Sequence, residues 1–163
     1  MEDPLLFDED YNLWVMMQQT RDAAWTAREK ELSNYGLSNM ESGVLFIIQV
    51  IEQTINRRAT IAEISRWLFR SPNSMSELIS RMEKKGLVTK ARDPSKRSAV
   101  NIAITEKGMQ FYKLSTERRI VHEIMSSLSE KERRQLWIAL GKIRNNALEL
   151  IGISNKPPFP QFL

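Results

Sequence analysis

The 163-residue sequence predicts a mainly α-helical fold that carries one small β-hairpin. Helix-capping signals recur ahead of runs whose apolar residues lie three and four positions apart. Two short runs between residues 87 and 104 have the alternation of half-buried strands. Hydrophobic residues make up 42% of the chain and charged residues 27%, so the chain can bury a core.

Within the first 36 residues, one long helix is expected over residues 9 to 34. The apolar patch at residues 5 to 7 follows no basic residue, so this end lacks the pattern of a secretory signal. The longest apolar run, residues 44 to 48, is far shorter than the roughly 20 residues of a membrane span. The sequence therefore predicts a soluble cytoplasmic protein that does not contact a membrane.

Three further helices are predicted between residues 38 and 85. Ser38 and Glu41 have the spacing of a capping box, in which each side chain bonds the backbone N–H of the other residue. Thr60 and Glu63 repeat this spacing ahead of a second, shorter helix. Both pairs precede runs of helical periodicity, so both are expected to mark helix starts.

The third of these helices has the clearest signals. Ser71 supplies a hydroxyl at the N-cap, and Pro72 occupies the first helical position, where its missing N–H costs nothing. Gly86 suits the end of the helix, because glycine readily adopts the left-handed conformation common there. One face is apolar and is expected to be buried; its residues are Met75, Leu78, Ile79 and Met82.

A β-hairpin is predicted next, from strands at residues 87 to 91 and 99 to 104. The connection, residues 92 to 98, contains turn formers and three basic side chains, Arg92, Lys96 and Arg97. The hairpin therefore has a positively charged tip.

Two helices are predicted after the hairpin. The first begins at Thr105 and runs to residue 128, with Gly108 as an unfavourable residue in its first turns. Ser129 and Glu132 form another capping-box signal, which starts a last helix reaching residue 151. The proline-rich end, residues 154 to 163, is expected to be an extended tail.

The order of elements indicates a helix-turn-helix followed by a wing. A short helix, a turn at residues 69 to 71 and a second helix have helix-turn-helix spacing, and the basic hairpin follows them. Charge is concentrated in the same interval: residues 57 to 97 carry 11 basic and 4 acidic side chains, whereas residues 1 to 56 carry 3 and 10. This block is expected to contact a polyanion.

Residues 38 to 108 resemble the winged helix-turn-helix of the MarR family of bacterial and archaeal transcription regulators. The resemblance rests on Thr60 to Ser65, on Ser74 to Ile79, on Arg81 to Val88 with its Glu-Lys-Lys-Gly-Leu-Val, on Asp93 to Arg97, and on Ile104 to Gly108 with its Thr-Glu-Lys-Gly. It implies a homodimer formed by the N- and C-terminal helices. The expected regions are 1–36 for dimerisation, 37–108 for DNA binding, 109–153 for dimerisation and 154–163 for the tail.

The outward face of the third helix is the predicted DNA-reading surface. If the apolar stripe is buried, the side chains left to enter the major groove are Asn73, Ser74, Ser76, Glu77, Ser80, Arg81 and Lys84. Family members often have arginine at the position of Glu77; here the carboxylate could accept from cytosine N4 or simply weaken non-specific binding. A merely solvated helix face is the alternative interpretation.

The wing also departs from the family pattern. Family members usually carry Asp-x-Arg, with the acid orienting the arginine, whereas an ungapped alignment places Lys96-Arg97-Ser98 there. Lys96 and Arg97 are expected over the minor groove or the flanking phosphates. Candidate phosphate clamps around the motif, each equally consistent with a solvated surface charge, are Arg57, Arg58, Arg66 and Arg70.

The last helix has an apolar stripe wider than one small domain needs. A dimer interface is favoured over an intrachain core for this set, which is Leu136, Trp137, Leu140, Ile143, Ala147, Leu150 and Ile151. Several aromatic and methionine side chains are expected near the junction with the winged helix; they are Trp14, Met16, Met17, Trp25, Tyr35 and Phe46. They could line a pocket for a small apolar or aromatic effector, although core packing is the commoner role of such residues.

The composition excludes several chemistries. The chain has no cysteine and a single histidine, His122, so disulfides, thiol redox sensing and Cys-containing metal sites are excluded, and no cofactor is expected. No glycine-rich phosphate loop or metal spacing supports an enzyme. The prediction is a dimeric sequence-specific regulator, most simply a repressor of a pseudo-palindromic operator; the alternative is a winged helix that binds proteins.

Overall fold

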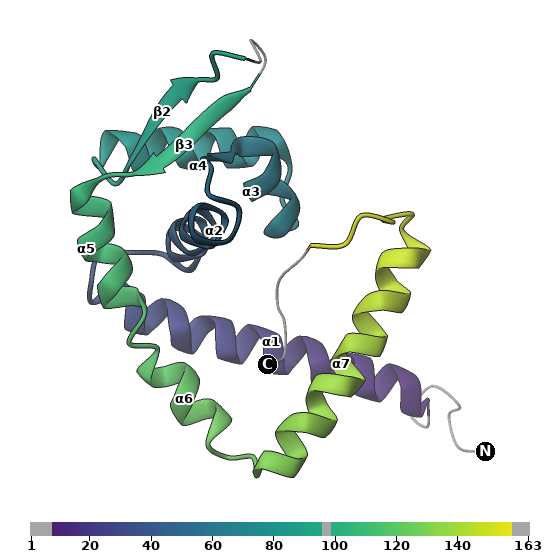
Figure 1. The fold of residues 1–163 in the computed structure, drawn as a ribbon. Helices are drawn as coiled ribbons and strands as arrows, with labels where there is room; N and C mark the ends of the chain where they lie inside the picture. Colours follow the sequence, from purple (N-terminus) through teal and green to yellow (C-terminus); the bar gives the residue numbers. More distant parts are fainter. Residues whose placement is uncertain (1–7, 96–98, 158–163) are drawn as a thin grey trace.

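The computed structural model describes residues 8–95 and 99–157 and is mostly helical, with one small sheet (Figure 1). The helices are α1 (Glu9–Ser33), α2 (Asn39–Ile55), α3 (Ile61–Trp67), α4 (Pro72–Lys84), α5 (Glu106–Ser115), α6 (Arg119–Met125) and α7 (Glu130–Leu150). The strands are β1 (Ala59–Thr60), β2 (Val88–Arg92) and β3 (Val100–Ile104). The predicted fold class, mainly α with a small wing, is confirmed.

The helices α2 and α3 begin where the capping signals predicted. The Ser38 hydroxyl accepts from the Glu41 backbone N–H at 3.1 Å, and the Glu41 carboxylate accepts from the Ser38 N–H at 3.0 Å. The same reciprocal pair forms at Thr60 and Glu63. These bonds satisfy N–H groups that have no partner inside the first turn of a helix.

The hairpin is confirmed, and a third strand extends it. β2 and β3 pair antiparallel, with Val88 opposite Ile104 and Arg92 opposite Val100. β1 pairs with the other edge of β3, with Ala59 opposite Ile102, so the sheet order is β1-β3-β2. The sequence does not predict β1, because a strand of two residues is too short to show periodicity.

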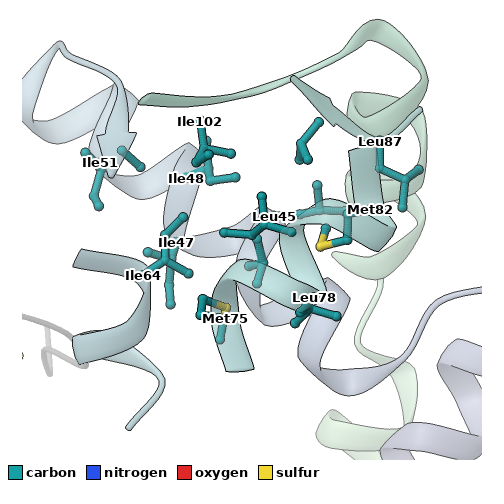
Figure 2. Close-up of a cluster of buried hydrophobic side chains, with 14 of the residues drawn as sticks. Leu45, Ile47, Ile48, Ile51, Ile64, Met75, Leu78, Met82, Leu87 and Ile102 are labelled. Carbon is teal, nitrogen blue, oxygen red and sulfur yellow. The ribbon is translucent and has the colours of Figure 1, made fainter. Parts of the chain in front are cut away.

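The core of the winged helix region surrounds α2 (Figure 2). Val44, Leu45 and Ile48 of α2 are fully buried, and Ile102 of β3 covers them from the sheet. The predicted stripe on α4 is buried throughout, with Met75, Leu78, Ile79 and Met82 at most 7% exposed. This packing fixes which side of α4 faces away from the core.

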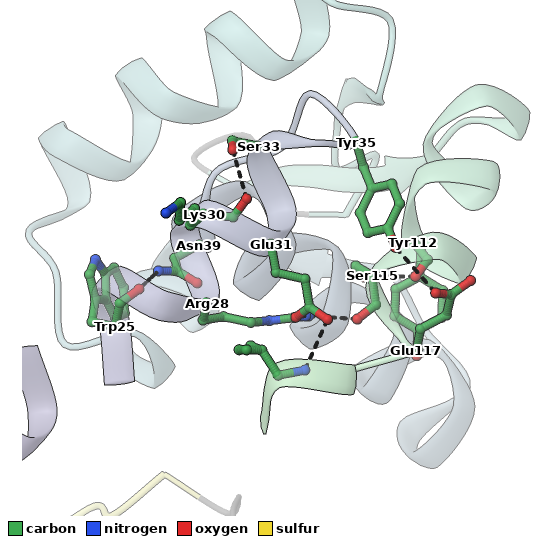
Figure 3. Close-up of polar contacts among 11 residues, drawn as sticks. Trp25, Arg28, Lys30, Glu31, Ser33, Tyr35, Asn39, Tyr112, Ser115 and Glu117 are labelled. Atoms are coloured by element: carbon green, nitrogen blue, oxygen red, sulfur yellow. Dashed lines mark hydrogen bonds and ion pairs between the residues drawn. The ribbon is translucent and has the colours of Figure 1, made fainter. Parts of the chain in front are cut away.

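The prediction of one helix over residues 105 to 128 is wrong. The chain breaks between α5 and α6, and Arg118 adopts a left-handed conformation with φ 49°. Side chains of α1 satisfy the backbone groups freed there: Arg28 donates to the Ser115 carbonyl at 2.6 Å, and Glu31 accepts from the Ile120 N–H at 3.0 Å (Figure 3). Arg28 and Glu31 also form an ion pair with each other. Contacts from α1, about 90 residues earlier in the chain, therefore stabilise the backbone at the break.

Gly108 has a packing role that its sequence context did not reveal. A Cβ atom at this position would lie 2.0 Å from the Leu87 carbonyl oxygen and 2.9 Å from the Ile104 Cγ2. The first turn of α5 thus passes directly against the start of β2, which only glycine allows. The residue that was expected to weaken the helix is what lets it leave the sheet at this angle.

The two longest helices bury little of their surface. Along α1, Glu31 and Leu32 are buried, both in the last turn, and along α7 only Leu148 is buried among the described residues. Both helices nevertheless carry many large apolar side chains. No helix in the described ranges combines the length and apolarity needed to cross a membrane.

Candidate nucleic-acid interface

The face of α4 opposite the core is exposed and polar. On an ideal helix with about 100° per residue, Asn73, Glu77 and Lys84 project within about 30° of the direction opposite the buried stripe. All three side chains are exposed in the structure. Ser76 and Arg81 flank this row and are also exposed. The predicted outward face therefore lies on the surface, from the first turn of the helix to its last residue.

Two serines of the predicted face are already hydrogen bonded. The Ser74 and Ser71 hydroxyls lie 2.8 Å apart, so Ser74 takes part in the N-cap. The Ser80 hydroxyl donates to the Ser76 carbonyl at 2.8 Å and accepts from Lys90 Nζ at 3.0 Å. Ser74 therefore takes part in capping α4, and Ser80 helps to join α4 to β2 through Lys90.

Lys90, on β2, connects the wing to α4. Its ammonium group lies 3.0 Å from the Ser80 hydroxyl and 3.0 Å from a Glu83 carboxylate oxygen. The Glu83 carboxylate also accepts from the Lys90 backbone N–H at 3.2 Å. The sequence does not predict this contact, because no local pattern pairs a strand residue with helix residues seven to ten positions earlier.

Asp93 forms hydrogen bonds that stabilise the described part of the wing. Its carboxylate accepts from the Ser95 backbone N–H at 2.7 Å and from the Ser95 hydroxyl at 2.6 Å. The Asp93 N–H donates to the Ala99 carbonyl at 2.9 Å across the hairpin. Arg92 is exposed at the end of β2. The predicted tip residues Lys96 and Arg97 lie outside the described residues.

Arg57 is engaged at the start of α3. It donates from both terminal nitrogens to the Glu63 carboxylate, once at 2.9 Å, and the Glu63 carboxylate also accepts from the Thr60 N–H at 3.0 Å. The bond from Arg57 is the main cause that lowers the pKa of Glu63 from 4.5 to about 2, despite partial burial, which acts in the opposite direction. The same bond raises the pKa of Arg57. This pair fixes the capping box of the first helix of the motif.

The other three arginines proposed as clamps are exposed around the motif. Arg58 precedes β1, Arg66 lies in the last turn of α3, and Arg70 lies in the turn between α3 and α4. Phe69 adopts φ 52° in this turn, and its carbonyl accepts from Arg70 at 3.2 Å. These guanidinium groups are available to an anion that approaches the motif.

Comparison with known proteins agrees with this geometry. Residues 37–108 match the family model of the winged helix DNA-binding domain. Residues 37–108 therefore have the winged helix fold. The matched range coincides with the DNA-binding region that the sequence predicted.

Solved structures match the whole chain as well as the winged helix domain. The organohalide-sensing regulator RdhR in its 2,4-dichlorophenol-bound form is 26% identical, with a TM-score of 0.83 over 99% of this chain and 96% of that one. MarR from E. coli, in complex with operator DNA, is 18% identical, with a TM-score of 0.74 over 85% and 97%. MepR from S. aureus, in complex with DNA, is 20% identical, with a TM-score of 0.72 over 86% and 98%. No relative was found among curated proteins by sequence.

These matches confirm the resemblance to MarR-family regulators at the level of the fold. The matched family model is that of a DNA-binding domain, and the 26% identical RdhR is described as a transcriptional regulator. The part of the chain that the structure describes contains no cluster of three or more side chains suited to hold a metal ion.

Outside the winged helix domain, α7 presents the predicted dimerisation stripe on its surface. Leu136, Trp137, Leu140 and Ile143 are 36 to 44% exposed, Leu150 and Ile151 are 79% and 66% exposed, and Ala147 is also exposed. The N-terminal half of α1 likewise exposes Tyr11, Leu13, Trp14 and Met16. Within the described residues, these side chains form two exposed apolar surfaces, one on α1 and one on α7.

The predicted effector residues do not meet at one place. Phe46 lines a cavity of about 360 Å³, together with Arg28, Tyr112, Arg118 and others. The Arg118 guanidinium lies 5.4 Å from the centre of the Phe46 ring. This cavity lies beside the break between α5 and α6. The sequence did not predict the break, and so it did not predict that Arg28 and Arg118 line a cavity there.

The remaining predicted effector residues lie elsewhere. Tyr35 donates to a Glu117 carboxylate oxygen at 3.2 Å, a bond that raises the pKa of Tyr35 (Figure 3). The Trp25 ring is 42% exposed, and its carbonyl accepts from Asn39 at 2.8 Å. Trp14 is 53% exposed and Met17 is partly buried, both in the first half of α1.

Proposed function

We propose that this chain is a homodimeric, sequence-specific repressor of transcription whose two winged helix domains bind the two halves of a pseudo-palindromic operator. The observation that carries the proposal is the exposed polar face of α4, held beside a basic wing in a domain whose structural neighbours are described in complex with DNA, in one case operator DNA. Such a regulator would act in the cytoplasm, at the nucleoid.

Different groups of residues serve affinity and specificity in this proposal. Arg58, Arg66 and Arg70 contact phosphates, together with Arg92 and the basic wing tip, and contribute to binding of any duplex. Asn73, Ser76, Glu77, Arg81 and Lys84 face the base edges of the major groove, with Ser74 and Ser80 shaping the helix that presents them. Because the Arg57 guanidinium is bonded to Glu63, its phosphate contact is expected to be weaker than those of the other three predicted clamps.

The dimer is supported by the uncovered surfaces of α1 and α7. A 21-residue helix with a single buried residue gains little from packing in its own chain, whereas a second copy would remove its apolar stripe from water. Replacing both Leu140 and Ile143 by glutamate should therefore yield monomers in sedimentation experiments. Asn145→Glu, on the opposite side of α7, is the matched control and should remain dimeric; two monomeric variants, or none, would contradict the assignment.

A phenol-class effector is proposed for the cavity lined by Phe46. The lining includes the aromatic residues Phe46 and Tyr112 and the basic residues Arg28 and Arg118, a combination that suits a flat ring bearing a hydroxyl or phenolate oxygen. RdhR, the 26% identical regulator, is described in a 2,4-dichlorophenol-bound form. Binding beside the break between α5 and α6 would shift the dimer toward a shape with the wrong half-site spacing and so release the operator.

Binding to duplex DNA tests the function directly. The full-length chain, titrated against its own upstream DNA and a random duplex of equal length, should prefer the former, and its affinity should fall steeply with salt. Ser76→Ala and Arg81→Ala should change which sequences bind, whereas Arg66→Gln should weaken binding to all of them. Equal affinity for both duplexes would overturn the proposal and favour a protein-binding role. Addition of 2,4-dichlorophenol should lower the operator affinity of the wild type and not that of Phe46→Ala.

A further inference from the structure

Glu77 is the only carboxylate that α4 directs away from the core. Its position lies about 30° from the direction opposite the buried stripe, between Asn73 and Lys84 in the central row of the face. The side chain is exposed. The other acidic residue of α4, Glu83, points to the wing and pairs with Lys90 at 3.0 Å. A single negative group thus stands at the centre of the surface proposed to enter DNA.

No ion pair neutralises Glu77 within the described parts of the chain. Arg81 follows four residues later, which is the spacing that favours a pair along a helix, yet the two side chains do not form one. The carboxylate is therefore left with its hydrogen-bonding capacity directed outward. Against the phosphates of DNA such a group is unfavourable, unless a base edge supplies a donor that compensates for it.

An ionised carboxylate can only accept hydrogen bonds, which restricts the bases it can face. In the major groove, guanine presents two acceptors and thymine presents one, so both repel it. Adenine offers the N6 amino group beside the N7 acceptor, which opposes the second carboxylate oxygen. The cytosine N4 amino group has an acceptor on one side only, the O6 of the paired guanine, whereas adenine N6 lies between N7 and the O4 of the paired thymine. The carboxylate therefore fits cytosine best.

We propose that Glu77 selects cytosine at one position of each operator half-site and excludes guanine and thymine there. The inference rests on the proposed function, since it requires that α4 lie in the major groove. It assigns the base preference at the centre of the half-site to a residue that also makes non-specific binding weaker.

Selection of bound sequences from a random duplex pool tests the assignment. Wild-type full-length protein should enrich an inverted repeat with a cytosine at one position of each half. Glu77→Gln should change that position to adenine, because glutamine bonds adenine N6 and N7 in a bidentate way. Glu77→Ala should lose preference at that position alone and should bind the wild-type site about tenfold more weakly. Glu123→Gln, an exposed charge removal on α6, should keep the wild-type consensus.

Each result decides one question. If both Glu77 variants enrich the wild-type consensus and bind every duplex more tightly, the carboxylate only repels DNA and the assignment to cytosine is wrong. If the wild type enriches an inverted repeat without a cytosine that responds to Glu77, the proposed function stands and this inference fails. If the wild type enriches no sequence, the proposed function fails, and the inference fails with it. Circular dichroism of the variants separates these outcomes from misfolding, which an exposed site does not favour.

Discussion

Replacing Glu63 by glutamine should remove a pH-dependent part of the stability of the winged helix domain. Glu63 caps α3 and pairs with Arg57, and glutamine at the same position can still accept the capping bond from the Thr60 N–H. The substitution therefore removes the charge while keeping most of the hydrogen bonding. Its effect reports the ion pair that holds the first helix of the motif.

The magnitude follows from the pKa of Glu63, which falls from 4.5 to about 2. A shift of this size corresponds to about 3 kcal/mol if it is converted in full. The Arg57 side chain is 47% exposed and that of Glu63 20%, so water screens the pair and we expect about 1 kcal/mol. Because the pKa is lowered on folding, this stability is complete above about pH 4.5 and is lost as the pH falls through about 2.

Urea unfolding of the wild type and of Glu63→Gln, measured between about pH 6 and about pH 2, checks the prediction. The free energies of unfolding should differ by about 1 kcal/mol near neutral pH and converge in acid. Arg57→Gln should reproduce this profile, and the double variant should be no less stable than either single variant. A difference that stays constant over the whole range would refute the electrostatic explanation and leave capping geometry as the cause.

Three other perturbations have definite expected results. Gly108→Ala should cost more than about 3 kcal/mol in urea unfolding, because its Cβ would meet the Leu87 carbonyl oxygen at 2.0 Å. Glu31→Gln should cost about 2 to 3 kcal/mol in the same assay, because it leaves the Arg28 guanidinium, 14% exposed, without its counter-charge. Arg66→Gln should reduce the slope of log affinity against log salt by about 0.9, as loss of one phosphate contact requires.

Each of these predictions has a control in the chain. Gly43→Ala meets only the flexible end of Leu68, at 3.2 Å, and should cost less than about 1 kcal/mol. Glu130→Gln breaks the exposed pair with Arg134 and should change stability by less than about 0.5 kcal/mol. Arg57→Gln should alter the salt slope less than Arg66→Gln does. Equal effects within a pair would show that close backbone approach for Gly108, burial for Glu31, or the absence of a bond to Glu63 for Arg66 is not the cause.

Local signals in the sequence were sufficient for the helices and the hairpin of the winged helix domain, although not for β1. Capping residues and a four-residue apolar stripe are read within one or two helical turns, so the start of α4 and its buried face could be predicted without knowing what packs against it. The hairpin follows in the same way from alternation on either side of a turn. Because the buried face of a helix also defines its exposed face, the candidate base-reading residues came from the sequence.

The tertiary structure decided everything that depends on partners distant in the chain. β1 is a strand only because β3 lies beside it, and the helix predicted over residues 105 to 128 is broken where Arg28 and Glu31 of α1 reach its backbone. The same contacts create the cavity beside Phe46, which no local pattern marks. Hydrogen bonds and ion pairs join whichever groups the fold brings together. The commitment of Arg57 to Glu63 and of Ser80 to Lys90 was therefore visible only once the chain was folded.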